Sequence, residues 1–220
     1  MTVHPFRVTD MDSASFQSTS PPNLLLVVSG SSGAGKDAVI DRMKELELPV
    51  AHVVTVTTRQ QRPTEIDGVH YHFVSVERFH QMLDSGDLLE WANVYQNYYG
   101  VPYFGVRDAL RSGKDAVVKV DVQGAATIRH TVPGAVLLFI RPPSIEELER
   151  RLRSRQSESS AEVAVRLGKA VEEYDQLHLF DYVLTNYPER LDEVVEQIKA
   201  IMVAEKLRVE PRHVQLSDCD

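Results

Sequence analysis

One segment constrains this chain more than any other, and its sequence is Gly30-Ser31-Ser32-Gly33-Ala34-Gly35-Lys36. It follows the apolar run 24–28 and precedes a helical pattern over 37–46, so a strand, a glycine-rich loop and a helix are expected in that order. Glycines let backbone N–H groups turn inward onto a polyphosphate, and the helix N-terminus adds partial positive charge. Because Lys36 can reach the β- and γ-phosphates, the segment predicts a phosphate-binding loop rather than an unliganded Gly/Ser turn.

Asp37 follows the loop at a position where Ser or Thr commonly contacts Mg²⁺. A carboxylate is a hard, charged oxygen ligand that suits Mg²⁺, although it also brings negative charge near the β-phosphate. The alternative is that Asp37 only interacts favourably with the helix N-terminus, which has a small effect on stability. We expect Asp37 to bind the metal ion directly or through water.

Short apolar runs alternate with helical patterns along most of the chain. The runs span residues 24–28, 52–57, 116–121, 135–140 and 182–184. Continuous Val, Leu, Ile and Ala stretches are typical of parallel strands that are covered on both faces. Helices are expected over 37–46, after an N-cap at Ser144 with Glu147, after a similar pair at Ser159 and Glu162, and beyond Pro188. The pattern predicts an α/β fold with a doubly wound sheet of about five parallel strands.

Length and composition limit the class of protein. The 220 residues suffice for one α/β core with small inserted subdomains, and a formal net charge of −8 argues against nucleic acid and anionic membranes as partners. Cys219 is the only cysteine, and the sequence shows no signal peptide or long apolar segment, so a cytoplasmic location is expected. Residues 1–22 and 208–220 lack periodicity, which predicts a disordered N-terminal extension and a loose C-terminal tail around a domain at 23–207.

Residues 59–105 break the alternation of strands and helices. They contain most of the tyrosines and the only tryptophan, Trp91. Residues 69–74 alternate like a half-exposed strand, and residues 76–83 have the pattern of a short helix. An insertion near the phosphate-binding loop is a place for a second substrate, and a β-rich excursion without a ligand is the alternative.

Two groups of polar residues in this insertion have the chemistry of a nucleotide site. Arg59 and Arg62 follow a predicted strand, and two guanidinium forks suit a phosphate monoester dianion, with solvated arginines as the alternative. Glu90 lies in an apolar segment, either as a surface group at a strand edge or as a group that reads a base. Guanine presents two adjacent donors, N1–H and the 2-amino group, which an ionised carboxylate accepts, whereas adenine has an acceptor at N1.

Charged residues also follow the later strands. Asp121 stands at the carboxyl end of a predicted buried strand, where it either assists Mg²⁺, contacts the second substrate or merely caps the next helix. A dense basic run comprises Arg141, Arg150, Arg151, Arg153, Arg155 and Arg166. Such a run is usually the solvated face of a helix, but arginines that close over a phosphoryl group lower the barrier to its transfer. Residues 153–160 lie between two predicted helices and are a candidate lid.

Together these segments resemble guanylate kinase, a phosphate-loop enzyme that transfers a phosphoryl group from ATP to GMP. The similarity extends from about residue 24 to residue 207. Its motifs, in matching order and spacing, are G-S-S-G-A-G-K, T-T-R-Q-Q-R-P, D-G-V-H-Y-H-F-V, L-L-E-W-A, N-Y-Y-G, D-V-Q-G, R-P-P-S and R-R-L-R-S-R. The resemblance implies ATP, GMP and Mg²⁺ as ligands, dGMP as a further acceptor, a β-rich GMP-binding subdomain at about 59–105 and a helical lid at about 151–167.

By this resemblance each group of site residues has an expected role. ATP would be bound by the loop residues Gly30, Ser31, Ser32, Gly33, Ala34, Gly35, Lys36 and Asp37, with Asn186 near the adenine. GMP would be bound by Thr55, Arg59, Arg62, Tyr71, Glu90, Tyr99 and Asp121. Catalysis would depend on Lys36, Arg59, Arg151, Arg155 and Arg166, and Mg²⁺ is expected at Asp37 and Asp121.

Several residues depart from the family pattern. Asp37 replaces Ser, Val101 replaces the Ser or Thr that commonly follows N-Y-Y-G, Lys119 replaces an acid, and Ser154 and Gln156 replace glycines of the lid.

The G-K-D sequence is shared with ribose-bisphosphate phosphokinases, but a base-free sugar phosphate would not require Arg62, Tyr71 and Glu90 together. Guanylate-kinase-like scaffold domains bind phosphopeptides without catalysis and have degraded phosphate loops, whereas this loop keeps Lys36. A kinase that acts on GMP is therefore predicted, with these two classes as alternatives.

Overall fold

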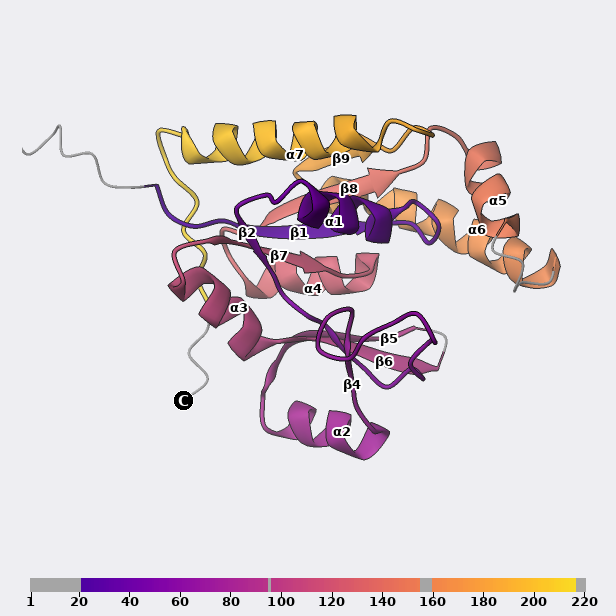
Figure 1. Ribbon diagram of the computed structural model, residues 1–220, viewed down its shortest axis with the longest axis horizontal. Helices are drawn as coiled ribbons and strands as arrows, with labels where there is room; N and C mark the ends of the chain where they lie inside the picture. The colour runs from indigo at the N-terminus through magenta and orange to yellow at the C-terminus, as the bar shows by residue number, and fades with distance from the viewer. Residues whose placement is uncertain (1–20, 95, 155–159, 217–220) are drawn as a thin grey trace, which may run out of the picture.

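The computed structural model describes residues 21–94, 96–154 and 160–216, and its centre is a parallel core sheet (Figure 1). The strands of this sheet are β1 (Leu25–Gly30), β2 (Val50–His52), β7 (Asp115–Lys119), β8 (Val136–Arg141) and β9 (Tyr182–Thr185). Their order is β2-β7-β1-β8-β9, and every neighbouring pair is parallel. Val27 in β1 lies opposite Val118 of β7 and Leu137 of β8. The predicted sheet of five parallel strands is confirmed.

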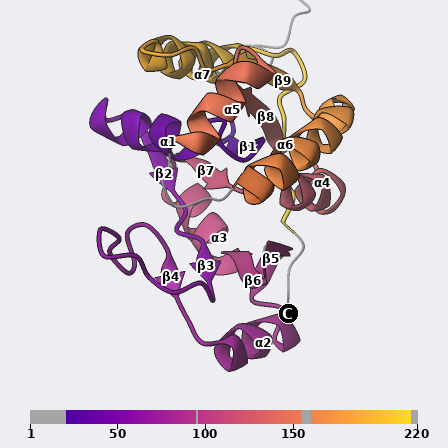
Figure 2. The same cartoon turned by 90° about the vertical axis from the view of Figure 1, so that its right-hand side faces the viewer.

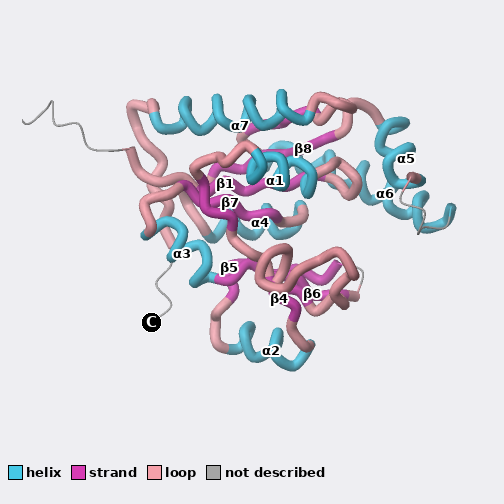
Figure 3. Tube along the Cα trace, in the orientation of Figure 1, coloured by secondary structure: helices cyan, strands magenta, loops and turns pink. Residues whose placement is uncertain are grey.

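Helices cover both faces of the core sheet, as a doubly wound fold requires (Figure 2, Figure 3). One face carries α1 (Lys36–Glu45) and α7 (Leu191–Lys206), and the other carries α3 (Tyr103–Arg111) and α4 (Val122–Thr131). Leu26 and Val28 of β1 pack among residues of α1 and α7, whereas Leu25 and Val27 pack among residues of α3 and α4. Because both faces are buried, β1 needs the continuous apolar run seen in the sequence. Among the described helices, none has the length and apolar character that crossing a lipid bilayer requires.

Two helices, α5 (Ile145–Arg153) and α6 (Ser160–Asp175), lie beyond the carboxyl ends of the core strands, at the right of Figure 1. A short 3₁₀ helix, η3 (Gln176–Leu179), follows α6. Leu148 and Leu152 of α5 form a small core with residues of α6. Ser144 caps α5 as predicted, because its hydroxyl accepts a hydrogen bond from the Glu147 N–H group at 3.2 Å. The second predicted cap depends on Ser159, which lies outside the described residues.

A second, mixed sheet lies below the core sheet in Figure 1. Its strands are β3 (Val56–Thr57), β4 (His72–Phe73), β5 (Leu88–Val94) and β6 (Asn97–Pro102), in the order β4-β3-β6-β5. The pair β3–β4 is parallel, and the pairs β3–β6 and β5–β6 are antiparallel. The helix α2 (Val76–Asp84) packs on this sheet, where its buried Phe79 stacks on Tyr98 with ring centroids 5.3 Å apart.

Two predicted strands differ from the structure. The run 52–57 is predicted as one strand, but His52 ends β2 in the core sheet and Val56 begins β3 in the second sheet. A run of β-branched residues shows no sign of a change of partner, so the pattern misses the crossing. Within the predicted strand at 69–74 only the two residues of β4 form a strand. Tyr71 makes an isolated bridge with Asp67 across a turn in which the Gly68 N–H group bonds the Tyr71 carbonyl at 2.8 Å.

Residues 208–216, the described part of the predicted C-terminal tail, contact the core of the molecule. Arg212 donates hydrogen bonds to Glu205 of α7 at 2.9 Å and to Asp181 at 3.0 Å. The side chain of Glu205 is 1% exposed. Burial alone would raise the pKa of this carboxyl group, but hydrogen bonds from Arg212 and Tyr182 lower it. Val214 and Leu216 also pack, partly buried, against the core beside α3 and α4, but the segment has no apolar period from which this packing is predicted.

Candidate active site

The loop after β1 has the backbone that a phosphate cradle requires. Gly30, Gly33 and Gly35 have φ values of 142°, 87° and 94°, a region that residues with a Cβ atom rarely adopt. Lys36 begins α1, and its Nζ donates to the Gly30 carbonyl at 2.5 Å and to the Ser31 carbonyl at 3.1 Å. The lysine ammonium group therefore lies over the loop, where phosphate oxygens can replace these carbonyls as its acceptors.

Glu173 of α6 is a buried acid beside the loop that the sequence analysis missed. It is 8% exposed, it accepts a hydrogen bond from the Ser32 N–H group, and its Oε2 has no partner among the described residues. Burial raises the pKa of Glu173 and lowers the pKa of Lys36, while the attraction between the two groups opposes both shifts. The sequence does contain a signal for Glu173, because it lies three residues after Ala170 and therefore on the apolar face of the helix. An acid on such a face needs a partner.

Arg151 and Asn186 hold the outer side of the loop. The Ala34 carbonyl accepts hydrogen bonds from Arg151 Nη1 at 3.1 Å and from the Asn186 side-chain amide at 2.9 Å. Arg151 also donates to the Asn186 carbonyl at 2.8 Å and to Glu147 at 2.6 Å. A Cβ at Gly35 would overlap the Asn186 amide, so this approach requires glycine. The structure therefore ties α5 and the end of β9 to the loop.

Arg166 approaches the same loop from α6. Its Nη1 atom lies 3.4 Å from the Ser32 hydroxyl, which accepts the hydrogen bond. Arg151 and Arg166 thus come together at the loop from two different helices. Arg155, which the resemblance groups with them, and the lid residue Gln156 lie outside the described residues.

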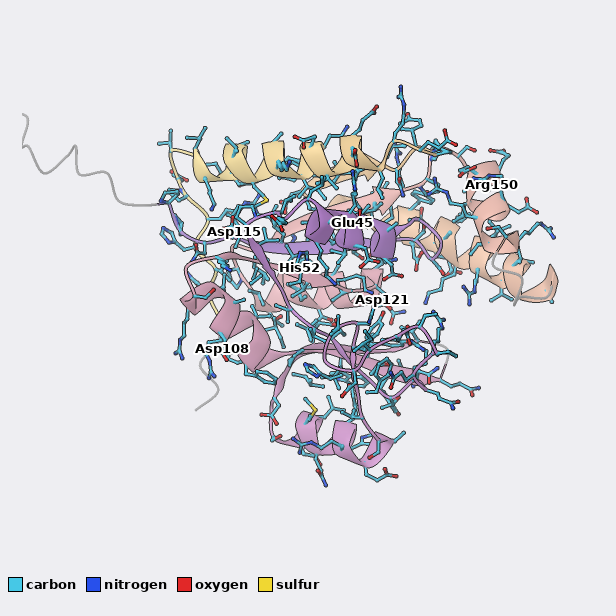
Figure 4. The ribbon with its side chains drawn as sticks, in the orientation of Figure 1. Glu45, His52, Asp108, Asp115, Asp121 and Arg150 are labelled. Atoms are coloured by element: carbon cyan, nitrogen blue, oxygen red, sulfur yellow. The ribbon has the colours of Figure 1, made fainter. Side chains whose placement is uncertain are left out.

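A cavity of about 190 Å³ lies between the loop, the end of β7 and the second sheet. The predicted acceptor and metal residues that line it together with Lys36 are Asp37, Thr55, Tyr71, Glu90, Tyr99 and Asp121. Figure 4 shows Asp121 at the edge of the core sheet that faces the second sheet. The fold thus brings Lys36, predicted to bind phosphate, and the residues predicted to read a base to one cavity.

Glu90 of β5 is buried in the wall of this cavity. It is 4% exposed, and its Oε2 atom has no hydrogen-bond partner among the described residues. Burial, with a smaller contribution from the charge of Asp121, raises the pKa of Glu90 to about 8. A Cβ at Gly124 of α4 would overlap the carboxyl group, so a glycine permits this close approach. A buried acceptor without a partner lowers stability and is typical of a group that binds a ligand.

Arg59 and Arg62 differ in how firmly they are held. Arg59 donates to Glu65 at 2.7 Å, hydrogen bonds to Tyr99, and lies with its Cζ 5.5 Å from the centroid of the Tyr71 ring. The Arg62 side chain is 67% exposed and lies 4.0 Å from Glu65. Burial alone would raise the pKa of Glu65, but Arg59 lowers it. Arg59 is therefore preorganised beside Tyr71, whereas Arg62 remains free to turn toward an incoming anion.

Asp37 and Lys119, two of the departures from the family pattern, contact each other. Lys119 Nζ donates to the Asp37 carboxylate in the first turn of α1 and to the Tyr71 hydroxyl at 2.9 Å. Burial alone would lower the pKa of Lys119, but Asp37 and Tyr71 raise it. Since 82 residues separate Asp37 and Lys119, sequence spacing gives no indication of this ion pair.

The acids of the site fit a metal ion only if other ligands accompany it. Among the described residues, no group of three or more His, Cys, Asp or Glu side chains is arranged to hold a metal. Asp121 caps α4 through Oδ1, which accepts from the Gly124 N–H group at 2.8 Å, and its buried Oδ2 has no partner among the described residues. Asp37 shares its carboxylate with Lys119. Mg²⁺ often takes one or two carboxylates together with substrate phosphates, so Asp37 and Asp121 suit a metal that arrives with a polyphosphate.

Comparison with known proteins identifies the family and agrees with the fold. The sequence profile of guanylate kinase matches residues 23–205. Guanylate kinase of Desulfitobacterium hafniense (strain Y51) is 40% identical over 186 residues, which cover 84% of this chain and 92% of that protein. Guanylate kinase 2, chloroplastic/mitochondrial, of Oryza sativa subsp. japonica is 42% identical over 197 residues, which cover 89% of this chain and 69% of that protein. The crystal structure of guanylate kinase from Anaplasma phagocytophilum has a TM-score of 0.70 at 31% identity, and the match covers 86% of this chain and 89% of that one. This chain therefore belongs to the guanylate kinase family.

Proposed function

We propose that this chain transfers the γ-phosphoryl group of ATP to GMP, giving ADP and GDP, and that it also accepts dGMP. The observation that carries the proposal is that Lys36 and Glu90 line one cavity. Lys36 belongs to a loop shaped for a polyphosphate, and Glu90 is a buried carboxyl group that needs a ligand with donors. A sugar phosphate without a base does not offer Glu90 the two adjacent donors of guanine, N1–H and the 2-amino group. A phosphopeptide does not require a loop that is shaped for a polyphosphate.

On this proposal ATP is held by the loop and by the residues around it. The N–H groups of the loop and Lys36 bind the phosphates, and Asn186 lies on the adenine side. Mg²⁺, held by the phosphates with Asp37 and Asp121, would neutralise charge on the transferring group. Glu173 keeps Lys36 charged and in place.

The acceptor is held at both ends in this proposal. Arg59, Arg62, Tyr71 and Tyr99 bind the phosphate of GMP, and Glu90, Thr55 and Asp121 bind guanine. The burial of Glu90 and of Thr55, which is 7% exposed, supports the assignment, because base discrimination needs polar groups that water does not reach. Val101, which is 1% exposed, stands where the family commonly has Ser or Thr. Because valine has no hydroxyl group, the hydrogen bond that Ser or Thr would make to the base is absent from this chain.

Catalysis then depends on position and electrostatics rather than on proton transfer. The phosphate of GMP is already a nucleophile, so the protein has to align it with ATP and to stabilise the equatorial oxygens of the transferring group. Arg151, Arg155 and Arg166 supply this stabilisation, with Lys36 and Arg59. We assign the first three arginines to a lid, at 151–167 within the domain at 23–207, that closes over the phosphates and excludes water.

The partners and the location follow from this assignment. ATP and GMP are the partners, and the acidic surface makes nucleic acid and anionic membranes unsuitable ones. Residues 59–105 are the GMP-binding subdomain, residues 1–22 and 208–220 flank the enzyme, and the site of action is the cytoplasm. Fluorescence microscopy of the tagged full chain tests the location.

An acceptor panel tests the proposed function. GMP, AMP, CMP, UMP and ribose 1,5-bisphosphate are each incubated with the protein, ATP and Mg²⁺, and release of ADP is measured. GMP is expected to give the highest kcat/KM. A higher value for ribose 1,5-bisphosphate would favour the sugar phosphokinase, and phosphopeptide binding without turnover of any acceptor would favour the scaffold class.

GMP binding is expected to release a proton at neutral pH. The pKa of Glu90 in the free protein is about 8, and the ionised carboxylate is the form that accepts both guanine donors. Affinity for guanosine, which has no titrating phosphate, should therefore rise by up to about tenfold per pH unit toward pH 8. Calorimetry at neutral pH in buffers with different ionisation heats checks this, and a binding heat independent of the buffer would contradict it.

Two substitutions of Asp37 distinguish a metal ligand from a helix-end residue. Asp37→Ser should leave an active enzyme whose rate has a changed dependence on Mg²⁺ concentration, because a hydroxyl group replaces a carboxylate. Asp37→Ala should weaken ATP binding in the presence of Mg²⁺. If both variants keep the parent Mg²⁺ titration and lose only thermal stability, Asp37 is a helix-end residue and not a metal ligand.

A further inference from the structure

Lys119 joins two parts of the molecule at the proposed acceptor site. It ends β7, and its ammonium group reaches both Asp37 at the start of α1 and the Tyr71 hydroxyl beside the second sheet, 2.9 Å away. The Lys119 side chain is 22% exposed, whereas that of Asp37 is 70% exposed. The lysine is therefore the enclosed member of this ion pair, and it lies on the inner side, toward the cavity.

Tyr71 lies between two cations from different elements. The Lys119 Nζ atom is 4.8 Å from the centroid of the Tyr71 ring, and the Arg59 Cζ atom is 5.5 Å from the same centroid. Lys119, Tyr71 and Thr55 also line two neighbouring cavities, so Lys119 lies at their shared wall. Arg59 pairs with Glu65 and Lys119 pairs with Asp37, and an anion that binds beside Tyr71 would be attracted by both cations.

The hydrogen bonds of Lys119 leave room for such an anion. An ammonium group has three N–H donors. Among the described residues, Lys119 directs one of them at the Asp37 carboxylate and one at the Tyr71 hydroxyl. One donor therefore remains for an incoming oxygen. An isolated ion pair with an exposed partner contributes little to stability, so stability alone is a weak reason for a lysine in this position.

We propose that Lys119 binds the phosphate of the acceptor nucleotide, and that Asp37 holds its ammonium group beside Tyr71. The inference rests on the proposed function, because it takes the acceptor to be a nucleoside monophosphate. Arg59 and Arg62 approach the phosphate from the second sheet, and Lys119 approaches it from the carboxyl end of β7. In the family pattern an acid commonly stands at this position, so the lysine gives this chain a phosphate contact of its own.

Equilibrium binding separates this role from a structural ion pair. GMP and guanosine are titrated by calorimetry into the full chain and into Lys119→Met, Lys119→Arg and Lys199→Met. Lys199 is the matched control, because it makes the same change of charge on α7, where it pairs with Glu196 at 2.6 Å. Lys119→Met should weaken GMP binding by roughly 10- to 100-fold and leave guanosine binding within about twofold, since only the phosphate contact is lost. Lys119→Arg should retain most of the GMP affinity, and the control should match the parent.

Each other outcome has a defined meaning. If Lys119→Met binds GMP as tightly as the parent does, or loses guanosine and GMP equally, Lys119 does not bind the phosphate and the pair is structural. If Lys119→Met fails to fold, the comparison is made with Lys119→Gln, and unchanged GMP binding there would equally overturn the assignment. If the parent chain binds neither GMP nor guanosine, the proposed function fails together with this inference, whereas tight GMP binding with an unaffected Lys119→Met overturns the inference alone.

Discussion

Glu90→Gln is expected to lower kcat/KM for GMP by roughly 30- to 1,000-fold, equivalent to about 2–4 kcal/mol. Glutamine keeps the shape of the side chain but directs an NH₂ donor at the guanine donors, so one hydrogen bond becomes a repulsive contact. The site is buried, and water cannot replace the lost acceptor. Steady-state kinetics at saturating ATP measure the effect, with Glu77→Gln at the exposed start of α2 as the control. An unchanged kcat/KM would remove Glu90 from the acceptor site.

The same substitution should stabilise the ligand-free protein. The pKa of Glu90 is about 8 in the folded state against an ordinary value of 4.5, so between these values the folded state holds a proton that the unfolded chain has lost. The free energy of unfolding of the parent therefore falls as pH rises through this window, and glutamine has no such loss. Thermal unfolding at several pH values should show a Tm advantage for Glu90→Gln that grows toward pH 8. A constant Tm difference would show that Glu90 is ionised in the empty site.

Arg166→Ala is expected to lower kcat by roughly 100- to 1,000-fold while changing KM for either substrate much less. Its guanidinium group lies at the loop, where Nη1 donates to the Ser32 hydroxyl at 3.4 Å, and its contacts should strengthen as charge develops on the transferring phosphoryl group. Arg151→Ala should also lower kcat, but Arg151 binds the Ala34 and Asn186 carbonyls and its loss should cost stability as well. Thermal unfolding of both variants separates a loss of stability from a loss of catalysis.

Arg62→Ala is expected to change KM for GMP rather than kcat, in contrast to Arg166→Ala. Its exposed side chain is proposed to bind the phosphate of GMP in the ground state and in the transition state alike, so KM for GMP should rise with little change in kcat. If Arg62→Ala instead lowers kcat and Arg166→Ala raises KM, the acceptor clamp and the lid have been assigned to the wrong arginines.

Local patterns account for what the sequence predicts well. The loop from Gly30 to Lys36 and the cap at Ser144 are each defined within a few residues, where backbone geometry and hydrogen bonding dictate residue type. The core strands are predicted because a strand buried on both faces must be apolar throughout, and the run that becomes β8 shows this directly. These features need no knowledge of which distant segments meet.

The second sheet and its contacts depend on partners far away in the sequence. β3 and β4 contain two residues each, too few for a periodic pattern, and β3 is held by β6 from about 40 residues later. The ion pair of Asp37 with Lys119 and the position of Glu173 beside Lys36 likewise arise only when the chain folds. The resemblance of the motifs predicts that Glu90 and Tyr71 share one site. The burial of Glu90 and its unpaired Oε2 atom are visible only in the folded structure.

The charged clamp around Arg212 has a consequence for how the chain is made. Arg212 links Glu205 of α7 and Asp181 before β9, yet the ribosome adds it after every strand and helix described here. Until then Asp181 can pair with Arg129 and Glu205 can accept from Tyr182, but the guanidinium group that links the two acids is missing. The last strand and helix can dock through their apolar residues before this link forms, and the link then fastens the end of α7 to the segment before β9, so truncation just before Arg212 should loosen this edge and make it more sensitive to proteases.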